Sequence, residues 1–138
     1  MGDSIRRGAA FTRIALCAGA TAAALALVGW WPTAARVGSA GVPAMLAAIA
    51  IALVGAWAGT APAVWILNRP PQQHAAGLLT GLAVRFGVTI GLTLALWLTD
   101  AFAARPLLLW VGIAQFVILA VDVAGLSSIL RRAAKEAA

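Results

Sequence analysis

Residues 107–130 read LLLWVGIAQFVILAVDVAGLSSIL, a run in which Asp122 is the one ionisable side chain. A helix needs about 20 mainly apolar residues to cross the hydrocarbon layer of a bilayer, and this run is long enough. Its apolar residues do not alternate with polar ones, as they would in a membrane β-barrel. The run therefore predicts a membrane-spanning helix, introduced by Arg105-Pro106, since proline suits a first helical turn.

Three further apolar runs precede this one, with short polar breaks between them. We expect them to span the membrane at residues 11–31, 42–67 and 76–99. The first is expected to close at Pro32, behind two tryptophans of the kind found at membrane interfaces. The second is expected to be kinked or frayed near its end by Thr60, Pro62 and Asn68.

The composition agrees with lipid as the main solvent. Of 138 residues, 63% are hydrophobic and 10% are charged, proportions that a soluble domain with a wet surface does not sustain. We therefore predict an all-α membrane protein whose four helices form two antiparallel hairpins. Residues 1–138 would be a single membrane domain, with basic tails at 1–10 and 131–138.

The positions of the basic residues predict the orientation, because lysine and arginine in short loops are retained on the cytoplasmic side. With four spans, both termini and the central loop share one side, and seven basic residues lie there or at the adjoining span ends: Arg6, Arg7, Arg13, Arg69, Arg131, Arg132 and Lys135. The other side has Arg36 and Arg105. We expect an integral protein of the bacterial inner (plasma) membrane with both termini cytoplasmic.

The net charge of +6 follows from this topology signal and from attraction of the tails to anionic lipid head groups, so no nucleic acid partner is expected. A basic N-terminus before an apolar run also resembles a secretory signal peptide, and Arg6-Arg7 resembles part of a twin-arginine signal. Because residues 11–31 are long enough to span the membrane, we expect this segment to be retained.

Two ionisable residues, Arg85 and Asp122, lie deep inside the predicted spans, where a charge costs at least a few kcal/mol. At the rise of an α-helix, Arg85 lies roughly 14 Å and Asp122 roughly 12 Å from the cytoplasmic ends of their helices. Residues of an antiparallel pair face each other when they are equidistant from the connecting loop, and these two reflect about a point between Ala103 and Ala104. The register predicts an Arg85–Asp122 ion pair.

Further polar residues extend this level into an intramembrane polar seam between the third and fourth spans. Thr93 and Gln115 nearly reflect onto each other, Thr89 lies between Arg85 and Thr93 at steps of four, and Gln115 shares a helix face with Asp122. The pair could serve to lock the register of the two helices, a contact usually contributing about 0.6 to 2 kcal/mol. Alternatively, its charges contact an ion-carrying partner or line a path.

Glycines at intervals of four mark faces on which helices pack closely or dock a partner. These helix-packing or docking candidates are Gly55, Gly59, Gly77, Gly81, Gly87 and Gly91. For catalysis the sequence offers no phosphate-binding loop, no nucleophile with a base and no cluster of carboxylates. Cys17 and His74 lack partners for a metal or disulfide site. We expect neither an enzyme nor a bound cofactor.

The last two spans contain Gly81-Leu82-Ala83-Val84-Arg85 and, at residues 107–115, LLLWVGIAQ. Both resemble the ATP synthase protein I family, small four-helix membrane proteins associated with the F-type ATP synthase. The first is similar to a family run of glycine, acidic, two apolar and basic residues, and the second to an apolar fourth helix with one glutamine. Leu82 departs from the acidic position of many members, and we expect Asp122 to supply the negative partner instead.

The resemblance implies a non-enzymatic accessory role, assisting subunit c of the synthase to assemble into its membrane ring, with a part in magnesium supply as a further option. Two other classes stay open from the residues. One is a small ion transporter or channel subunit, in which buried charges line a path. The other is an integral accessory subunit of a respiratory or photosynthetic complex, with the glycine faces as its docking surface.

Overall fold

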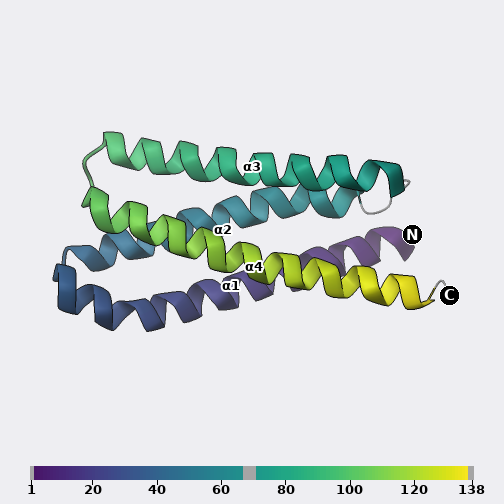
Figure 1. Ribbon diagram of the computed structural model, residues 1–138, viewed down its shortest axis with the longest axis horizontal. Coiled ribbons are helices and arrows are strands. Elements are labelled where there is room, and N and C mark those ends of the chain that lie inside the picture. Colours follow the sequence, from purple (N-terminus) through teal and green to yellow (C-terminus); the bar gives the residue numbers. More distant parts are fainter. Residues whose placement is uncertain (1, 67–70, 137–138) are drawn as a thin grey trace.

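The computed structural model describes residues 2–66 and 71–136 and consists there of four helices. They are α1 (Gly2–Val37), α2 (Gly41–Ile66), α3 (Pro71–Leu98) and α4 (Ala104–Glu136). Side chains are described for these ranges except at 2–8, 10, 63–66, 71, 72, 74, 126 and 129–136. Each helix includes a segment long and apolar enough to cross a membrane. Successive helices run in alternate directions, and the two termini lie at the same end (Figure 1).

The helix α1 continues past Pro32, where the sequence led us to expect its end. Proline removes one backbone donor, but neighbouring helices in a membrane bundle allow a helix to tolerate this loss. The helix ends instead at Val37, and Gly38 follows with φ of 78°. Its N–H donates to the Ala34 carbonyl at 3.1 Å. Only glycine adopts this left-handed conformation without steric cost, so Gly38 is the stop signal.

The other helix bounds also differ from the predicted spans. The helix α4 begins at Ala104 and continues to Glu136, and α1 begins at Gly2, so helical structure extends into both predicted tails. The apolar pattern marks only the part of a helix that lies in lipid, and it does not register polar turns beyond the membrane. Pro62 lies within α2, which ends at Ile66. Asn68 lies outside the described residues.

The helix α2 is the centre of the bundle. It packs against all three other helices, whereas α3 and α4 make the least contact of any pair that touches. In the most apolar membrane-length stretch of α2, 56% of the residues are buried, whereas in the corresponding stretch of α3 only 17% are buried. Figure 1 accordingly shows α3 and α1 on opposite sides, with α2 and α4 between them. The most extensive packing of α3 is therefore against α2.

Glycines allow this close packing of α2 on α3. A Cβ atom added to Gly59 would lie 2.6 Å from the Gly81 carbonyl oxygen and 2.8 Å from Arg85 Cβ, and one added to Gly55 would overlap Thr89 Oγ1. A side chain at Gly59 would require the α3 backbone to move, and one at Gly55 would displace the Thr89 side chain and crowd the Arg85 carbonyl oxygen at 3.2 Å. Gly77 and Gly81, on the facing helix, are also buried. These four glycines pack the bundle internally.

The remaining two glycines of the predicted set have a different environment. Gly87 and Gly91 are exposed, and a Cβ added to either would meet no heavy atom within 4 Å. They lie on the outer surface of α3, where the bundle itself does not use them.

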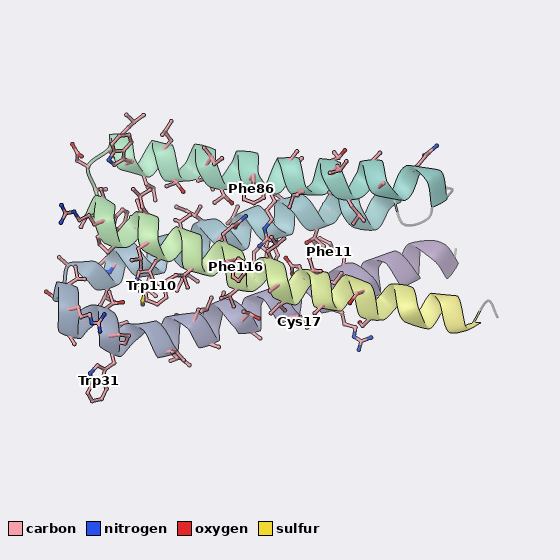
Figure 2. All side chains as sticks on the ribbon, in the orientation of Figure 1. Phe11, Cys17, Trp31, Phe86, Trp110 and Phe116 are labelled. Carbon is pink, nitrogen blue, oxygen red and sulfur yellow. The ribbon has the colours of Figure 1, made fainter. Side chains whose placement is uncertain are left out.

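Alanines, branched aliphatic residues and one methionine build the core between α1, α2 and α4. Ala18, Ala22, Met45, Ala52 and Ile118 form its centre, each no more than 5% exposed. The outer surface is apolar instead of polar. Trp31 is 80% exposed and points away from the bundle (Figure 2). A soluble monomer does not expose large hydrophobic side chains all round, so the four helices fit an integral membrane protein.

A hydrogen bond ties α4 to α1 near the end of the bundle opposite the termini. Trp110 Nε1 donates to Thr33 Oγ1 at 3.0 Å, and the Thr33 hydroxyl donates to Met45 Sδ at 3.4 Å. A Cβ added to Gly29 would overlap the Trp110 ring. The absence of a side chain at Gly29 thus makes room for this indole in α1.

The change Trp110→Phe removes the indole donor, and we expect it to lower the free energy of unfolding by about 1 kcal/mol. The measurement is unfolding in mixed detergent micelles. The matched control is Trp31→Phe. Because the Trp31 ring faces outward, this change should not measurably alter the free energy of unfolding. Equal effects of the two changes would contradict the assignment of a stabilising role to the Trp110–Thr33 bond.

Candidate functional site

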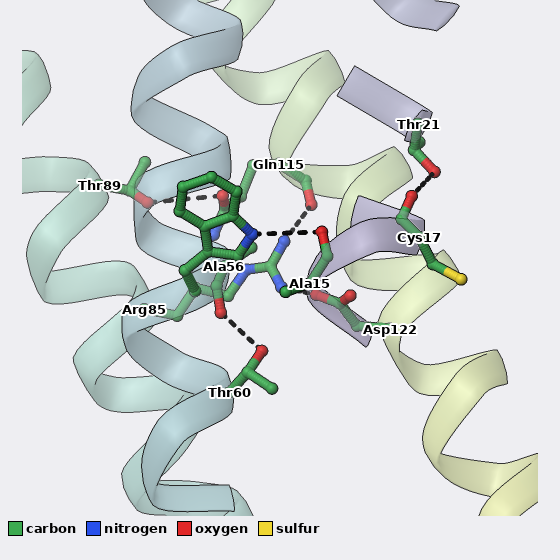
Figure 3. Close-up of polar contacts among 10 residues, drawn as sticks. Ala15, Cys17, Thr21, Ala56, Thr60, Arg85, Thr89, Gln115 and Asp122 are labelled. Atoms are coloured by element: carbon green, nitrogen blue, oxygen red, sulfur yellow. Dashed lines mark hydrogen bonds and ion pairs between the residues drawn. The ribbon is translucent and has the colours of Figure 1, made fainter. Parts of the chain in front are cut away.

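Arg85 of α3 and Asp122 of α4 form an ion pair inside the bundle, as the register of the two helices predicts. Arg85 Nη1 donates to Asp122 Oδ2 (Figure 3). The two residues are 4% and 6% exposed. Each is therefore shielded from the hydrocarbon that would surround the bundle, where an isolated charge is costly.

The guanidinium also reaches a second group on α4. Arg85 Nη2 donates to the Gln115 carbonyl oxygen at 3.3 Å, two turns of helix before Asp122. The planar guanidinium group of arginine presents N–H donors in fixed directions, so it can bond two acceptors at once. The ammonium group of lysine has no such fixed arrangement of donors. Because α3 and α4 pack little against each other, this long side chain is the main bridge between them at this level.

The part of the predicted polar seam that contains Thr89, Thr93 and Gln115 is arranged differently from the expectation. Thr93 Oγ1 donates to the Thr89 carbonyl of its own helix at 2.7 Å, and Thr89 Oγ1 faces Gln115 Oε1 at 3.5 Å. The expected pairing of Thr93 with Gln115 is therefore wrong. A threonine hydroxyl readily bonds the carbonyl four residues earlier. Its short side chain does not cross to α4, whereas the longer glutamine reaches across to Thr89.

All five residues of the predicted seam are buried, namely Arg85, Thr89, Thr93, Gln115 and Asp122. Three of their buried polar atoms have no hydrogen-bond partner: Arg85 Nε, Gln115 Nε2 and Asp122 Oδ1. Unpartnered buried polar atoms are rare and costly, and each calls for a physical explanation. The seam thus keeps both donor and acceptor capacity after the ion pair has formed.

A cavity of about 260 Å³ adjoins the ion pair. Its inner wall is formed by buried residues of the three helices: Ala56, Gly59, Thr60, Gly81, Arg85 and Asp122. Its outer wall consists of larger apolar residues that include Leu79 and Val123, which are 67% and 56% exposed. The cavity therefore has an apolar, outward-facing side and a charged inner end.

Counting along the sequence could not predict the cavity or the two tryptophan contacts that join helices. The Trp57 indole donates to the Ala15 carbonyl at 3.4 Å, in addition to the Trp110–Thr33 bond. Both tryptophans occur within apolar runs, where a tryptophan signals burial or an interface without naming its partner. Thr33 follows Pro32 directly and therefore fell beyond the predicted end of the first span.

The structure says less about the other candidate residues, which are His74, Cys17 and the basic residues near the termini and in the central loop. The side chains of His74 and of the basic residues Arg6, Arg7, Arg131, Arg132 and Lys135 lie outside the described part, as does Arg69 entirely. Cys17 is exposed. Among the side chains that the structure describes, no three of the types His, Cys, Asp and Glu come together as a metal site.

No protein-family model, curated protein or solved structure matches this chain.

Proposed function

We propose that the protein is a non-enzymatic accessory or assembly factor of the bacterial inner membrane, and that α3 docks a transmembrane helix of its partner. The observation that carries this proposal is the environment of Gly87 and Gly91, which leave open space on the outer face of α3. Small residues at this spacing let two helix backbones approach closely in lipid. The other glycines of the set are occupied by packing within the bundle.

The ion pair supports the same proposal. Arg85 and Asp122 bind each other, so they hold α3 in place against α4 while its outer face stays available. The resemblance of the α3 and α4 segments to the ATP synthase protein I family suggests the partner, which is subunit c of the F-type synthase. In this role the protein would hold subunit c during ring assembly and would catalyse no reaction.

Capture in mild detergent tests the partner. The wild-type protein is expected to recover subunit c, and the double change Gly87→Leu and Gly91→Leu is expected to reduce recovery about tenfold, since overpacking a helix contact costs about 1–3 kcal/mol. Gly112→Leu is the matched control on α4, because Gly112 also has open space around it. It should recover subunit c fully.

The outcomes of this capture separate the alternatives. Unchanged recovery by the double variant would contradict docking through Gly87 and Gly91. Recovery of a respiratory or photosynthetic complex in place of subunit c would favour an integral accessory subunit. Ion flux in proteoliposomes that contain only this protein would favour a transporter or channel, for which the cavity beside the ion pair would be the natural path.

The proposed orientation has two antiparallel hairpins with both termini in the cytoplasm, which agrees with the termini lying at one end of the bundle (Figure 1). Cysteine labelling tests it in a Cys17→Ala background. We expect an impermeant maleimide to label Ser39→Cys, in the α1–α2 connection, from outside intact spheroplasts. Ser4→Cys should react only after permeabilisation. The reverse pattern would show that the orientation is inverted.

A further inference from the structure

The cavity between α2, α3 and α4 has the construction of a ligand site. Its volume of about 260 Å³ exceeds the roughly 150 Å³ of an engineered apolar cavity that holds benzene. Binding sites for small molecules are mainly apolar and contain a few polar groups that fix the orientation of the ligand. Here those groups are Arg85, Asp122 and Thr60.

The exposed lining residues place the mouth of the cavity on the lipid-facing surface. Leu79 and Leu82 of α3 and Val123 of α4 line it and are 67%, 38% and 56% exposed. The scant packing between α3 and α4 leaves this side without a helix–helix seal. A molecule dissolved in the bilayer can therefore reach the cavity without passing through water.

The charges at the inner end select against a charged head group. Arg85 would attract an acid, but Asp122 beside it would repel the same group, and an amine meets the opposite combination. The pair as a whole is neutral. A head group that both donates and accepts a hydrogen bond meets no such conflict, and a hydroxyl is the smallest one.

The unpartnered atoms of the pair supply what a hydroxyl needs. Arg85 Nε is an unpartnered buried donor and Asp122 Oδ1 an unpartnered buried acceptor, and both residues line the cavity. Rotation about the Cβ–Cγ bond of an aspartate is broad and twofold, so either oxygen of the carboxylate can turn toward the cavity. Hydrogen bonds to charged groups are the stronger kind in proteins.

From these observations we propose that the cavity binds one uncharged amphiphile from the bilayer, an apolar chain that ends in a hydroxyl group. The hydroxyl would donate to the Asp122 carboxylate and accept from the Arg85 guanidinium, and the chain would lie against Leu79, Leu82 and Val123. This proposal does not rest on the proposed partner, since the ligand site opens between α3 and α4 and requires no second protein.

Photolabelling with matched probes tests this site on the full chain in lipid nanodiscs. The probes are decanol, decanoate and decylamine, each with the same diazirine in its chain, and labelled residues are identified by peptide mass spectrometry. Decanol is expected to label the cavity-lining residues about tenfold more than either charged probe. A ratio of this size corresponds to the net contribution of one hydrogen bond to a charged group. Unlabelled decanol should compete.

Two variants locate the site. Leu119→Trp fills the cavity and should abolish this labelling, whereas Leu108→Trp, at a residue that is 56% exposed and outside the cavity, should not. The double change Arg85→Met and Asp122→Leu should remove the preference for the alcohol. If Leu119→Trp does not fold, Leu82→Trp replaces it.

The proposal is overturned by equal labelling with all three probes, as expected if water or non-specific lipid fills the cavity. Labelling confined to residues outside the cavity, or labelling that persists in the filled variant, overturns it as well.

Discussion

Replacing Asp122 with leucine is expected to lower the free energy of unfolding by about 3–5 kcal/mol, because it leaves the buried Arg85 charge without a partner. The guanidinium cannot lose its proton, and Arg85 lies within Ala75–Leu98, the segment of α3 that is long and apolar enough to cross a membrane. The loss exceeds the 0.6 to 2 kcal/mol or so of an ordinary polar contact between membrane helices. Unfolding in mixed micelles or bilayers measures it.

The double change Arg85→Met and Asp122→Leu is the control for this prediction. Replacing both members of a buried ion pair with apolar residues of similar size is often neutral or stabilising, so we expect the double variant to unfold within about 1 kcal/mol of the wild type. Exchanging the charges, with Arg85→Asp and Asp122→Arg, should also restore folding. Single variants as stable as the wild type would contradict a structural role of the pair.

The change Gly59→Leu is expected to produce the second large effect. The Gly81 carbonyl oxygen and Arg85 Cβ lie 2.6 and 2.8 Å from the position of an added Cβ, so α3 must move away from α2. Overpacking of this kind costs about 1–3 kcal/mol, and we expect the upper end because a rigid backbone carbonyl, and not a flexible side chain, blocks the space. The displacement would also move Arg85 and weaken the ion pair.

The matched control for this prediction is Gly91→Leu on the outer face of α3, which has no neighbour within 4 Å. Leucine favours the helix over glycine by up to about 1 kcal/mol, so this variant should be as stable as the wild type or more so. Unfolding in mixed micelles compares the two. If Gly59→Leu proved harmless, α2 and α3 could not pack as closely as described.

Sequence reasoning identified the four helices and the ion pair for simple physical reasons. A span in lipid must be long and apolar, so each run near 20 residues shows directly in the sequence. A buried charge in such a run needs a partner, and a short connection between antiparallel helices fixes which residues lie at the same depth. Arg85 and Asp122 were therefore predictable from counting alone.

Other features depend on packing, which counting does not reveal. Thr93 was misassigned because depth alone does not tell whether a short hydroxyl turns to its own helix or across a gap. The end of α1 was misplaced because tertiary contacts allow Pro32 within a helix, and Gly38 was the effective signal. The four glycine positions that pack α2 on α3 could not be told from Gly87 and Gly91 by spacing.

The central position of α2 illustrates the same limit. Its sequence is apolar on all sides, so no face indicates which neighbour it contacts. Small residues on α2 and α3, Gly55 and Gly59 among them, let the two backbones come together, and α4 then meets α3 mainly through Arg85. The polar bridge between α3 and α4 and the adjoining cavity both follow from the close packing of α3 on α2 and its small contact with α4.

The most direct test of the account is a solid-state NMR measurement of the contact between the Arg85 guanidinium and the Asp122 carboxylate in lipid bilayers. With arginine nitrogen and aspartate carbon labelled, and Asp122→Asn as the spectral control, we predict a dipolar coupling that places a guanidinium nitrogen within about 4 Å of the Asp122 carboxylate carbon. Absence of that coupling in the folded protein would contradict the ion pair, and with it the position of α3 in the bundle.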